Sequence, residues 1–503
     1  MTPSRRISTP SCRFLSFAVI ALLVFLASAA SALAADVSFK VVDGDTGKTL
    51  EGVVVTARDS TGVAWLGTGT SGGNGIATIA GLPASYAISV AVEQVPRGYS
   101  SFPVQTNTAS PQPINVPLYV EANQWLMWGR DNGHTRLGPA CGLPGKTPVW
   151  ATKAENTTEF PPSVAYGMAF YGNYAGIITA QNIFDGSVVW KRWVGVPTPD
   201  PVTHKIIKTK FANQPAVSSW TQTTNGVSRK VAAVYFADTQ GWVHAVDAYT
   251  GLDIWGPING AKGQNFKSFE ASPLVVGETL YVATRFNKWG SKSRLWALDK
   301  RTGAAKWSVQ LGMKKSSKIA ASPAYAGGRI YTASYDGYVF SVNAANGKIV
   351  WRQKIGKIFY GTPTVANGKI YLGDRGSGVM YCLKTSNGAI QWKKNLGASV
   401  YSSPAMADGR LFIGSGKRMM ALASGTGAVL WQKKTKGKIM GSASVLKGVV
   451  YISDFSKRTY GFDAKTGKTV WTFKDGRYSP ITASRGMILL TGWKTLYGFK
   501  PGS

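Results

Sequence analysis

Short apolar strands recur at regular spacing from about residue 121 onward. Each is followed by a turn of small and polar residues that contains a Gly, and then by a Trp, as in residues 246–255, 298–307 and 462–471. The complete units end at Trp190, Trp255, Trp307, Trp351, Trp392, Trp431 and Trp471. Second strands with an aromatic residue, such as Ile330-Tyr331-Thr332, lie between them. Four short strands repeated about every 40 residues predict the blades of a β-propeller.

The last unit of this repeat is incomplete. After Trp471 three more strands follow, around residues 481, 488–490 and 496–499, and an outer strand is missing. Residues 148–150, upstream of the first complete unit, supply that strand. The pattern therefore predicts an all-β, eight-bladed propeller of four-stranded blades, closed by its first and last strands so that no sheet edge is left exposed. The Trp of each unit is predicted to fill the gap to the next blade.

Residues 36–120 have a different pattern, in which apolar and polar residues alternate. Strands such as residues 37–41 and 52–56 are separated by Gly- and Asp-rich turns. Alternation with a period of two predicts half-buried strands, and therefore an all-β domain. The predicted organisation is a signal peptide over residues 1–35, this β-domain over 36–120 and the propeller over 121–503.

The first residues have the features of an export signal. Arg5, Arg6 and Arg13 precede an apolar run over residues 14–26, and Ala32-Leu33-Ala34 forms a cleavage site of small residues. The alternative is an uncleaved membrane anchor, because the apolar run approaches spanning length. No later segment is apolar enough to span a membrane, so cleavage would leave no transmembrane helix. We therefore predict an exported protein that is periplasmic, extracellular or on the cell surface.

The charge of the chain is strongly positive, with 57 Lys and Arg against 24 Asp and Glu and a formal net charge of +33. Outside the cytosol the available anionic partners are envelope polymers and acidic protein segments, and nucleic acid is a further candidate. The alternative is a generally basic surface that keeps the protein soluble. Charge alone does not choose between these interpretations.

Two motifs within the repeats resemble a known family. The pattern A-x-D-x-x-T-G-x-x-x-W occurs at residues 245–255 and 297–307, and with Gly first at 461–471. Residues 128–136, Trp-Gly-Arg-Asp-Asn-Gly-His-Thr-Arg, look like the lead-in segment of the same propellers. Nearly all of residues 121–503 thus resembles the PQQ-like repeat family, which includes pyrroloquinoline-quinone (PQQ) dehydrogenases and the propeller subunit of bacterial outer-membrane assembly. Residues 45–53 resemble the opening of collagen-adhesin B-type and carboxypeptidase-regulatory-like domains, a resemblance that implies a small immunoglobulin-like or prealbumin-like β-sandwich over residues 36–120.

The resemblance to quinoprotein dehydrogenases implies PQQ and a calcium or lanthanide ion near the propeller axis. Members of that group use a vicinal disulfide or similar floor, an Asp base, and Glu, Asn and Asp metal ligands. This chain has no adjacent cysteines, and its loop aspartates Asp238, Asp336, Asp374 and Asp454 stand singly. We predict that these aspartates cap turns, and we assign no catalytic, cofactor-binding or metal-binding residue. PQQ with calcium or a lanthanide stays the alternative.

Basic residues recur in the loops that meander topology places on one face of the propeller. Lysines before the innermost strands are Lys210, Lys267, Lys318, Lys357 and Lys438, and the loops between second and third strands add Arg285, Arg375, Arg418 and Arg458. Tyr360, Tyr401, Phe266 and Trp289 are predicted to lie among these charges. We predict a cationic ring that docks an anionic polymer or an acidic protein segment. The opposite face has its own lysines, so a solvated basic rim is the alternative.

The sequence favours an exported, non-catalytic binding or scaffold protein of the cell envelope. A PQQ-dependent oxidoreductase is the second hypothesis, and binding of PQQ with metal together with reduction of an acceptor dye would distinguish it. A third hypothesis is a structural surface protein displayed by its N-terminal sandwich. The sequence does not identify the partner.

Overall fold

The computed structural model describes residues 34–502 apart from short gaps. The gaps are residues 93–94, 97–98, 140, 195–197, 200–205, 208–209, 225, 262–263, 267, 286–292, 313–316, 479–480 and 485. The predicted signal peptide, except for its last two residues, lies outside the described part. Within the described residues no helix is long and apolar enough to span a bilayer. The chain divides into two compact units, one comprising the residues up to Val42 with Thr49–Pro96 and Pro103–Val116, the other Asp43–Lys48, Arg97–Phe102 and Pro117–Ser503.

The N-terminal strands form two four-stranded sheets, with the orders β4-β1-β8-β6 and β3-β2-β5-β7. Their bounds are β1 Ala34–Asp43, β2 Val54–Asp59, β3 Trp65–Thr70, β4 Ile76–Pro83, β5 Ala87–Val92, β6 Tyr99–Ser101, β7 Val104–Asn107 and β8 Ile114–Val120. Alternation along β1 buries Val37, Phe39 and Val41, while the residues between them are partly exposed. The period-two pattern thus produces the sheets because one face of each strand enters the apolar layer.

The rest of the chain forms eight four-stranded antiparallel sheets in the described residues, which we number blade 1 to blade 8. Blade 1 comprises β10 Ser163–Ala165, β11 Met168–Gly172, β12 Ile177–Asn182 and β13 Val188–Trp193; blade 2 β16 Ala216–Thr224, β17 Val227–Ala237, β18 Val243–Asp247 and β19 Asp253–Ile258; blade 3 β22 Leu274–Val276, β23 Thr279–Ala283, β24 Arg294–Asp299 and β25 Ala305–Gln310; blade 4 β26 Ala324–Ala326, β27 Arg329–Ala333, β28 Tyr338–Asn343 and β29 Ile349–Lys354. Blade 5 comprises β30 Thr364–Ala366, β31 Lys369–Gly373, β32 Val379–Lys384 and β33 Ile390–Asn395; blade 6 β34 Ala405–Ala407, β35 Arg410–Ser415, β36 Arg418–Ala423 and β37 Val429–Lys434; blade 7 β38 Ser444–Leu446, β39 Val449–Asp454, β40 Arg458–Asp463 and β41 Thr469–Phe473; blade 8 β42 Ile481–Ala483, β43 Ile488–Thr491, β44 Thr495–Phe499 and β9 Trp150–Lys153. Three short elements complete the assignment: the 3-10 turn η1 Glu121–Asn123, the pair β14 Thr198–Pro199 with β15 Ile206–Ile207, and the pair β20 Gly260–Ala261 with β21 Gln264–Asn265.

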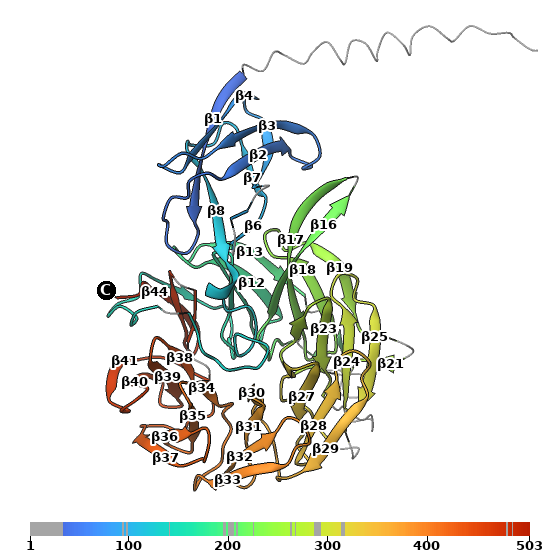
Figure 1. Ribbon diagram of the computed structural model, residues 1–503, viewed down its shortest axis with the longest axis vertical. Helices are drawn as coiled ribbons and strands as arrows, with labels where there is room; N and C mark the ends of the chain where they lie inside the picture. Colours follow the sequence, from blue (N-terminus) through green and yellow to red (C-terminus); the bar gives the residue numbers. More distant parts are fainter. Residues whose placement is uncertain are drawn as a thin grey trace, which may run out of the picture. The chain divides into compact units, whose positions relative to one another are not determined.

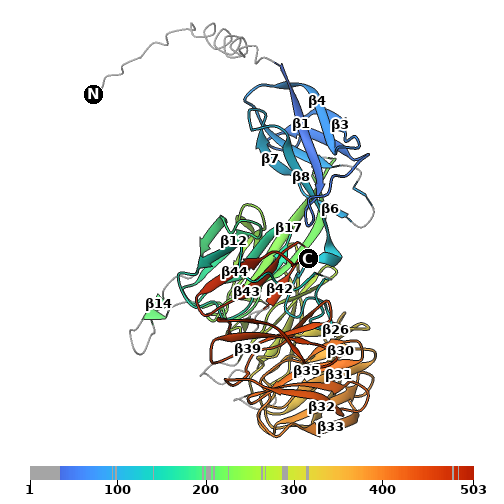
Figure 2. The ribbon, with the colours of Figure 1, turned by 90° about the vertical axis from the view of Figure 1, so that its left-hand side faces the viewer.

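Blade 8 joins the two ends of the propeller. Its outer strand β9 pairs with β44, with Trp150 opposite Gly498 and Ala151 opposite Tyr497. Figures 1 and 2 show β44, in red, beside the teal strands of blade 1. The closure predicted from residues 148–150 is confirmed, and the ring has no open edge at this point.

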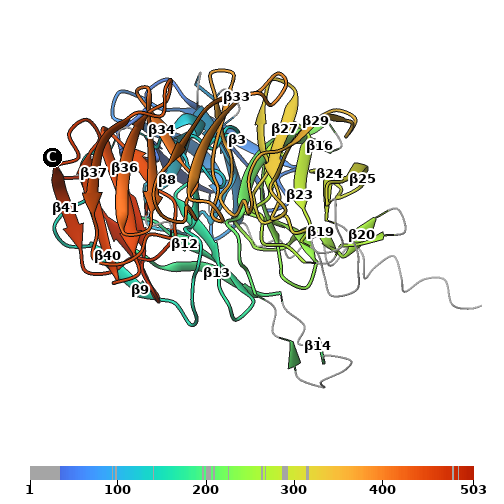
Figure 3. The same cartoon turned by 90° about the horizontal axis from the view of Figure 1, so that it is seen from below.

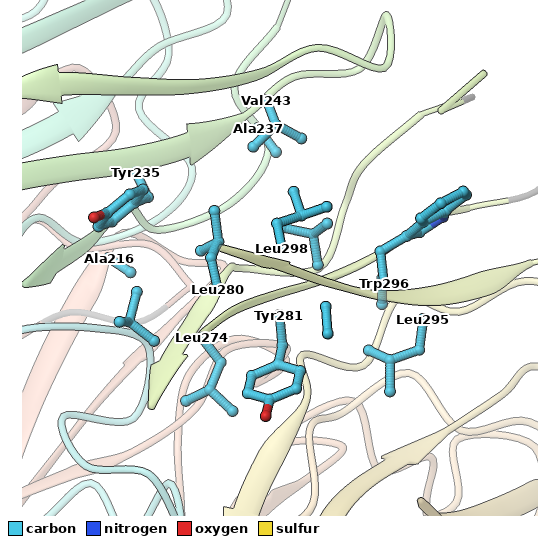
Figure 4. Close-up of a cluster of buried hydrophobic side chains, with 14 of the residues drawn as sticks. Ala216, Tyr235, Ala237, Val243, Leu274, Leu280, Tyr281, Leu295, Trp296 and Leu298 are labelled. Atoms are coloured by element: carbon cyan, nitrogen blue, oxygen red, sulfur yellow. The ribbon is translucent and has the colours of Figure 1, made fainter. Parts of the chain in front are cut away.

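The middle strands of each blade are buried on both faces. In blade 5, four consecutive residues of β31 and four of β32 are buried, whereas β33 is exposed along most of its length. Figure 3 shows the strands of neighbouring blades lying side by side. Between blades 2 and 3, Tyr235, Leu274 and Leu298 belong to one apolar cluster (Figure 4). The core is therefore a series of layers between blades, each of which needs its neighbours.

At seven of the eight junctions between blades in the described residues, a Trp of one blade packs on a Gly of the next. The indole N–H of Trp392 in blade 5 donates to the Ser424 carbonyl of blade 6 at 3.0 Å, and its ring covers Gly427, whose φ is +74°. A Cβ at Gly427 would lie 2.6 Å from that ring. The same indole bond is made by Trp150, Trp190, Trp255, Trp307, Trp351 and Trp431. The predicted gap-filling role of the Trp is confirmed, and the Gly of the motif provides both the left-handed turn and the space for the ring.

Candidate binding site on the propeller axis

The lead-in segment over residues 125–138 runs around the inside of the ring of innermost strands. Its carbonyl groups accept hydrogen bonds from successive blades, with N···O distances of 2.7 to 2.9 Å. The pairs are Leu126 with Val217, Asn132 with Tyr325, Gly133 with Val365, Thr135 with Met406, and Arg136 with Val445, while Trp125 pairs with Val164 in both directions. The segment therefore contacts blades 1, 2, 4, 5, 6 and 7.

A belt of hydroxyl groups, each two residues before an innermost strand begins, links neighbouring blades. The backbone N–H of Thr362 donates to the hydroxyl of Ser403 in the next blade at 2.8 Å. The equivalent bonds run from Gln214 to Ser272, Ser272 to Ser322, Ser322 to Thr362, and Ser403 to Ser442, at 2.9 to 3.1 Å. All of these hydroxyl residues are buried. The recurrence of Ser or Thr before Pro, as in Ser322-Pro323, was the sequence signal for this belt, and our sequence analysis missed it.

A pocket of about 680 Å³ lies on the axis, next to the belt. Trp128, Ser322, Thr362, Ser403 and Ser442 line it. The innermost-strand residue that binds the lead-in backbone stands three positions after each lining hydroxyl, in blades 4 to 7 alike. Three residues of strand span about 10 Å, so the lead-in backbone lies beyond the lining hydroxyls, and its Trp128 side chain reaches the pocket and closes that end. The pocket is therefore blind.

Three of the predicted cationic residues line this pocket: Lys210, Arg285 and Arg375. The Arg375 guanidinium lies over the Tyr401 ring, 4.6 Å from its centroid, and no ion pair holds it among the described residues. The Lys210 ammonium lies 5.2 Å from the Tyr174 centroid. Arg285 is ion-paired with Glu270. Cations that lie on aromatic rings keep their N–H groups available for an anion.

Aromatic side chains form much of the pocket wall. The Tyr360 ring lies 6.1 Å from Tyr401 and 5.8 Å from Tyr335, and Phe160 lies 5.3 Å from Trp128. The predictions for Tyr360 and Tyr401 hold, since both line the pocket. Phe266 was wrongly predicted, because its ring is 2 % exposed and belongs to the core between blades 2 and 3. Trp289 lies outside the described residues.

Two carboxylates also line the pocket, and their surroundings differ. Burial raises the pKa of Glu159, against the opposing effects of Arg477 and Lys210. Glu270 is neutralised by its ion pair with Arg285. The free positive charge of the pocket therefore comes from Arg375 and Lys210.

The remaining residues of the predicted ring lie apart from the pocket wall. Lys318 lies behind the aromatic wall, 6.0 Å from the Tyr335 centroid, and Lys357 and Lys438 are exposed on the loops. Arg418 donates to the Leu396 carbonyl at 2.6 Å and so fixes a loop, and Arg458 is half-buried. Lys267 lies outside the described residues. The structure thus brings three of the nine predicted residues together around one cavity.

Three of the four loop aspartates, Asp238, Asp374 and Asp454, cap turns as predicted, whereas Asp336 accepts the Ser334 hydroxyl instead. The carboxylate of Asp374 accepts the backbone N–H groups of Lys357, Ile358 and Gly376 at 2.7 to 3.0 Å. Burial works to raise the pKa of Asp374, but these bonds and the Ser377 hydroxyl outweigh it and hold the pKa below its usual value. Asp238 and Asp454 make equivalent turn bonds.

The donor set of the pocket does not fit a hard cation such as calcium or a lanthanide. Such an ion needs several converging oxygen ligands. Glu270 is already bound to Arg285, burial raises the pKa of Glu159, and cations surround both. Among the described residues no cluster of three or more His, Cys, Asp or Glu could hold a metal ion.

A buried guanidinium lies behind the lining residue Trp128. Arg136 is 0 % exposed, stacks 4.5 Å from the Trp128 centroid, and donates through Nε to the Ala443 carbonyl at 2.5 Å. Its Nη1 and Nη2 have no partner among the described residues. Burial, and secondarily Arg136 itself, lowers the pKa of the adjacent His134 to about 3, so that this imidazole is neutral. Arg136 is thus an unpaired positive charge beneath the floor.

Known proteins share this propeller. A family model described as outer membrane protein assembly factor BamB (PQQ_2) matches residues 208–321 and 291–499. The chain belongs to this family. The assembly factor BamB of Moranella endobia (strain PCIT) is 25% identical over 222 residues, 42% of this chain and 50% of that protein. The quinohemoprotein alcohol dehydrogenase of Comamonas testosteroni is 29% identical over 127 residues, 23% of this chain and 17% of that protein.

The likeness extends to solved structures. A europium-containing methanol dehydrogenase superposes with a TM-score of 0.59 at 13% identity, covering 73% of this chain and 89% of that chain. At this identity the likeness concerns the propeller fold alone. The chain spans half or less of the length of the two relatives named above. The predicted repeat family is confirmed, whereas the family of the N-terminal sandwich stays a prediction.

Proposed function

We propose that this protein is an exported, non-catalytic binding or scaffold propeller of the cell envelope, which docks an anionic partner on the face that carries the axial pocket. The observation that supports this most is the pairing of Arg375 with Tyr401 inside a blind pocket that also holds Lys210. A guanidinium supported on an aromatic ring and without a carboxylate partner is suited to an incoming anion. Membership of the BamB family supports a role in envelope assembly.

Binding to anionic polymers tests this proposal. The mature chain is titrated with fluorescent polyglutamate and with polygalacturonate at two salt concentrations. We expect binding that weakens with salt, because exposed and half-exposed charges are screened. The double variant Lys210→Ala/Arg375→Ala should weaken it by about tenfold or more, as expected for two charge-assisted contacts. The matched control, Lys348→Ala/Lys465→Ala, removes two exposed charges from the opposite face and should change it little. Equal loss in both variants would contradict docking at the pocket face.

The oxidoreductase hypothesis rests on the similarity to the quinohemoprotein relative. The donor set of the pocket argues against it, because that set does not fit calcium or a lanthanide. Calorimetric titration with PQQ plus calcium or a lanthanide, followed by an acceptor-dye assay, decides the matter. Stoichiometric binding with dye reduction would overturn the non-catalytic proposal.

A further inference from the structure

The floor of the axial pocket has hydrogen-bond donors that no described residue uses. The hydroxyl oxygens of Ser322, Thr362 and Ser403 each accept a backbone N–H from the preceding blade. Thr362 also accepts the indole N–H of Trp128 at 3.1 Å. A hydroxyl that accepts in this way still has its own proton to donate. These protons belong to residues that line the pocket, so they face a ligand from three consecutive blades.

The positive charge of Arg136 favours the same kind of ligand as these hydroxyl donors, namely an anion. The Nη groups of Arg136 are unpaired, and the side chain is completely buried against Trp128. A buried charge without a partner is costly unless another group compensates it. The neighbouring Asp131 attracts Arg136 electrostatically, but its carboxylate accepts the backbone N–H and the hydroxyl of Thr135, and no ion pair joins it to Arg136 among the described residues. An anion seated on the hydroxyl groups would complete this arrangement.

We propose that the pocket floor is a carboxylate subsite for a peptide ligand, in which Ser322, Thr362 and Ser403 donate their hydroxyl protons to the carboxylate and Arg136 supplies positive charge from below. This inference rests on the proposed docking function and gives the ligand an orientation. The carboxylate lies at the floor, and the apolar part of the ligand packs on Phe160, Tyr360, Tyr401 and Met440 of the wall. Arg375 contacts the ligand nearer the entrance.

The closed end of the pocket favours a peptide segment over a long polysaccharide. A polymer that runs through its site needs a groove open at both ends, and the lead-in segment blocks the far end here. A peptide presents a carboxylate at its C-terminus or on an Asp or Glu side chain. Both sources have the same chemistry and reach into a blind cavity.

Labelled hexapeptides of one apolar sequence test the subsite by fluorescence anisotropy. The first carries a central Gln and a C-terminal amide, the second a central Glu and the amide, and the third a central Gln and a free C-terminal carboxylate. We expect the second or the third to bind about tenfold more tightly than the first, as for a hydrogen-bonded charge, and the better of the two identifies the source. Equal affinity of all three, or binding of tetragalacturonate alone, would overturn the peptide subsite.

Variants of the belt separate a ligand contact from a structural role. Ser322→Ala and Ser272→Ala each remove one belt hydroxyl, but only Ser322 lines the pocket. We expect similar losses of stability, with a five- to tenfold loss of carboxylate-dependent affinity in Ser322→Ala alone. Arg136→Met, checked for folding by circular dichroism, should remove most of the preference for the carboxylate. If the two serine variants bind alike while Lys210→Ala/Arg375→Ala still loses polyglutamate, the floor subsite is wrong and the docking function stands.

Discussion

The latch between a Trp and the Gly of the next blade predicts a specific cost for a single methyl group. Gly427 and Gly409 both lie in turns of blade 6 with positive φ, +74° and +70°. A Cβ at Gly427 would lie 2.6 Å from the Trp392 ring, whereas a Cβ at Gly409 meets nothing within 4 Å. The two Gly→Ala variants therefore share the backbone penalty and differ in the steric clash.

The magnitude follows from these terms. The left-handed conformation costs Ala about 1 kcal/mol or slightly more, so we expect Gly409→Ala to lower the free energy of unfolding by about 1 kcal/mol. Overpacking adds about 1–3 kcal/mol in Gly427→Ala, and displacement of the ring from the Ser424 carbonyl adds about 1 kcal/mol. Gly427→Ala should therefore cost about 3–5 kcal/mol.

Urea unfolding followed by far-UV circular dichroism measures both variants, provided that the unfolding is reversible. In a Trp392→Ala background the cost of Gly427→Ala should fall to about 1 kcal/mol, because the ring that it strikes is gone. The reasoning is refuted if Gly427→Ala and Gly409→Ala have equal cost in the wild-type chain, or if the cost of Gly427→Ala is unchanged without the ring.

Three further predictions concern buried polar groups. Ser403→Ala leaves the buried N–H of Thr362 without its acceptor and should lower the free energy of unfolding in urea by about 1–3 kcal/mol. The control Ser386→Ala, at an exposed position, should change it by almost nothing. A near-zero effect of Ser403→Ala would contradict a stabilising role of the belt bonds. Asp374→Asn should lower the free energy of unfolding by about 2–3 kcal/mol at pH 7. Because the pKa of Asp374 in the folded protein lies below its unfolded value of about 3.9, the difference in free energy between this variant and the wild type should shrink as the pH falls below about 4. Asp408→Asn, at an exposed position, is the control. Burial raises the pKa of Glu159 in the folded protein above its unfolded value of about 4.3. The stability of the wild type should therefore decline as the pH rises from the unfolded pKa through the folded pKa. Thermal unfolding curves should show that Glu159→Gln abolishes this decline, whereas the control Glu155→Gln, at an exposed position, does not.

The propeller could be predicted from the sequence because its signals are local. Each blade repeats a strand pattern, a Gly turn and a Trp within one stretch of chain, and the missing outer strand of blade 8 was visible at residues 148–150. The path of the lead-in segment was not predictable in this way. Its bonds join Gly133 to Val365 and Arg136 to Val445, across hundreds of residues and through backbone groups that every residue carries. Backbone hydrogen bonding of this kind leaves no side-chain signature.

The candidate site was predictable in part, and the failures have a positional cause. Lysines recur four or five residues before the belt position, and among those that the structure describes only Lys210 lines the pocket. The position that lines the pocket in blades 2 to 7 stands two residues before the belt residue. Its occupants are Ala212, Glu270, Ala320, Tyr360, Tyr401 and Met440. Because these residues differ in chemistry, no repeated residue type marked the position.

This division between repeated and variable positions explains how a symmetric ring carries an asymmetric site. The Trp, the turn Gly and the belt hydroxyl recur because each joins one blade to the next, and the belt bonds hold blades 2 to 7 at the same level. The position two residues earlier makes no such bond, so it is free to vary while its backbone stays fixed. Tyr360 and Tyr401, from neighbouring blades, therefore form an aromatic wall on one side of the pocket. Glu270, with its ion-pair partner Arg285, places charged groups on another side. Ligand selectivity in this pocket is thus expected to reside in one residue per blade, and exchange of Tyr401 and Met440 should alter which ligand binds without altering the fold.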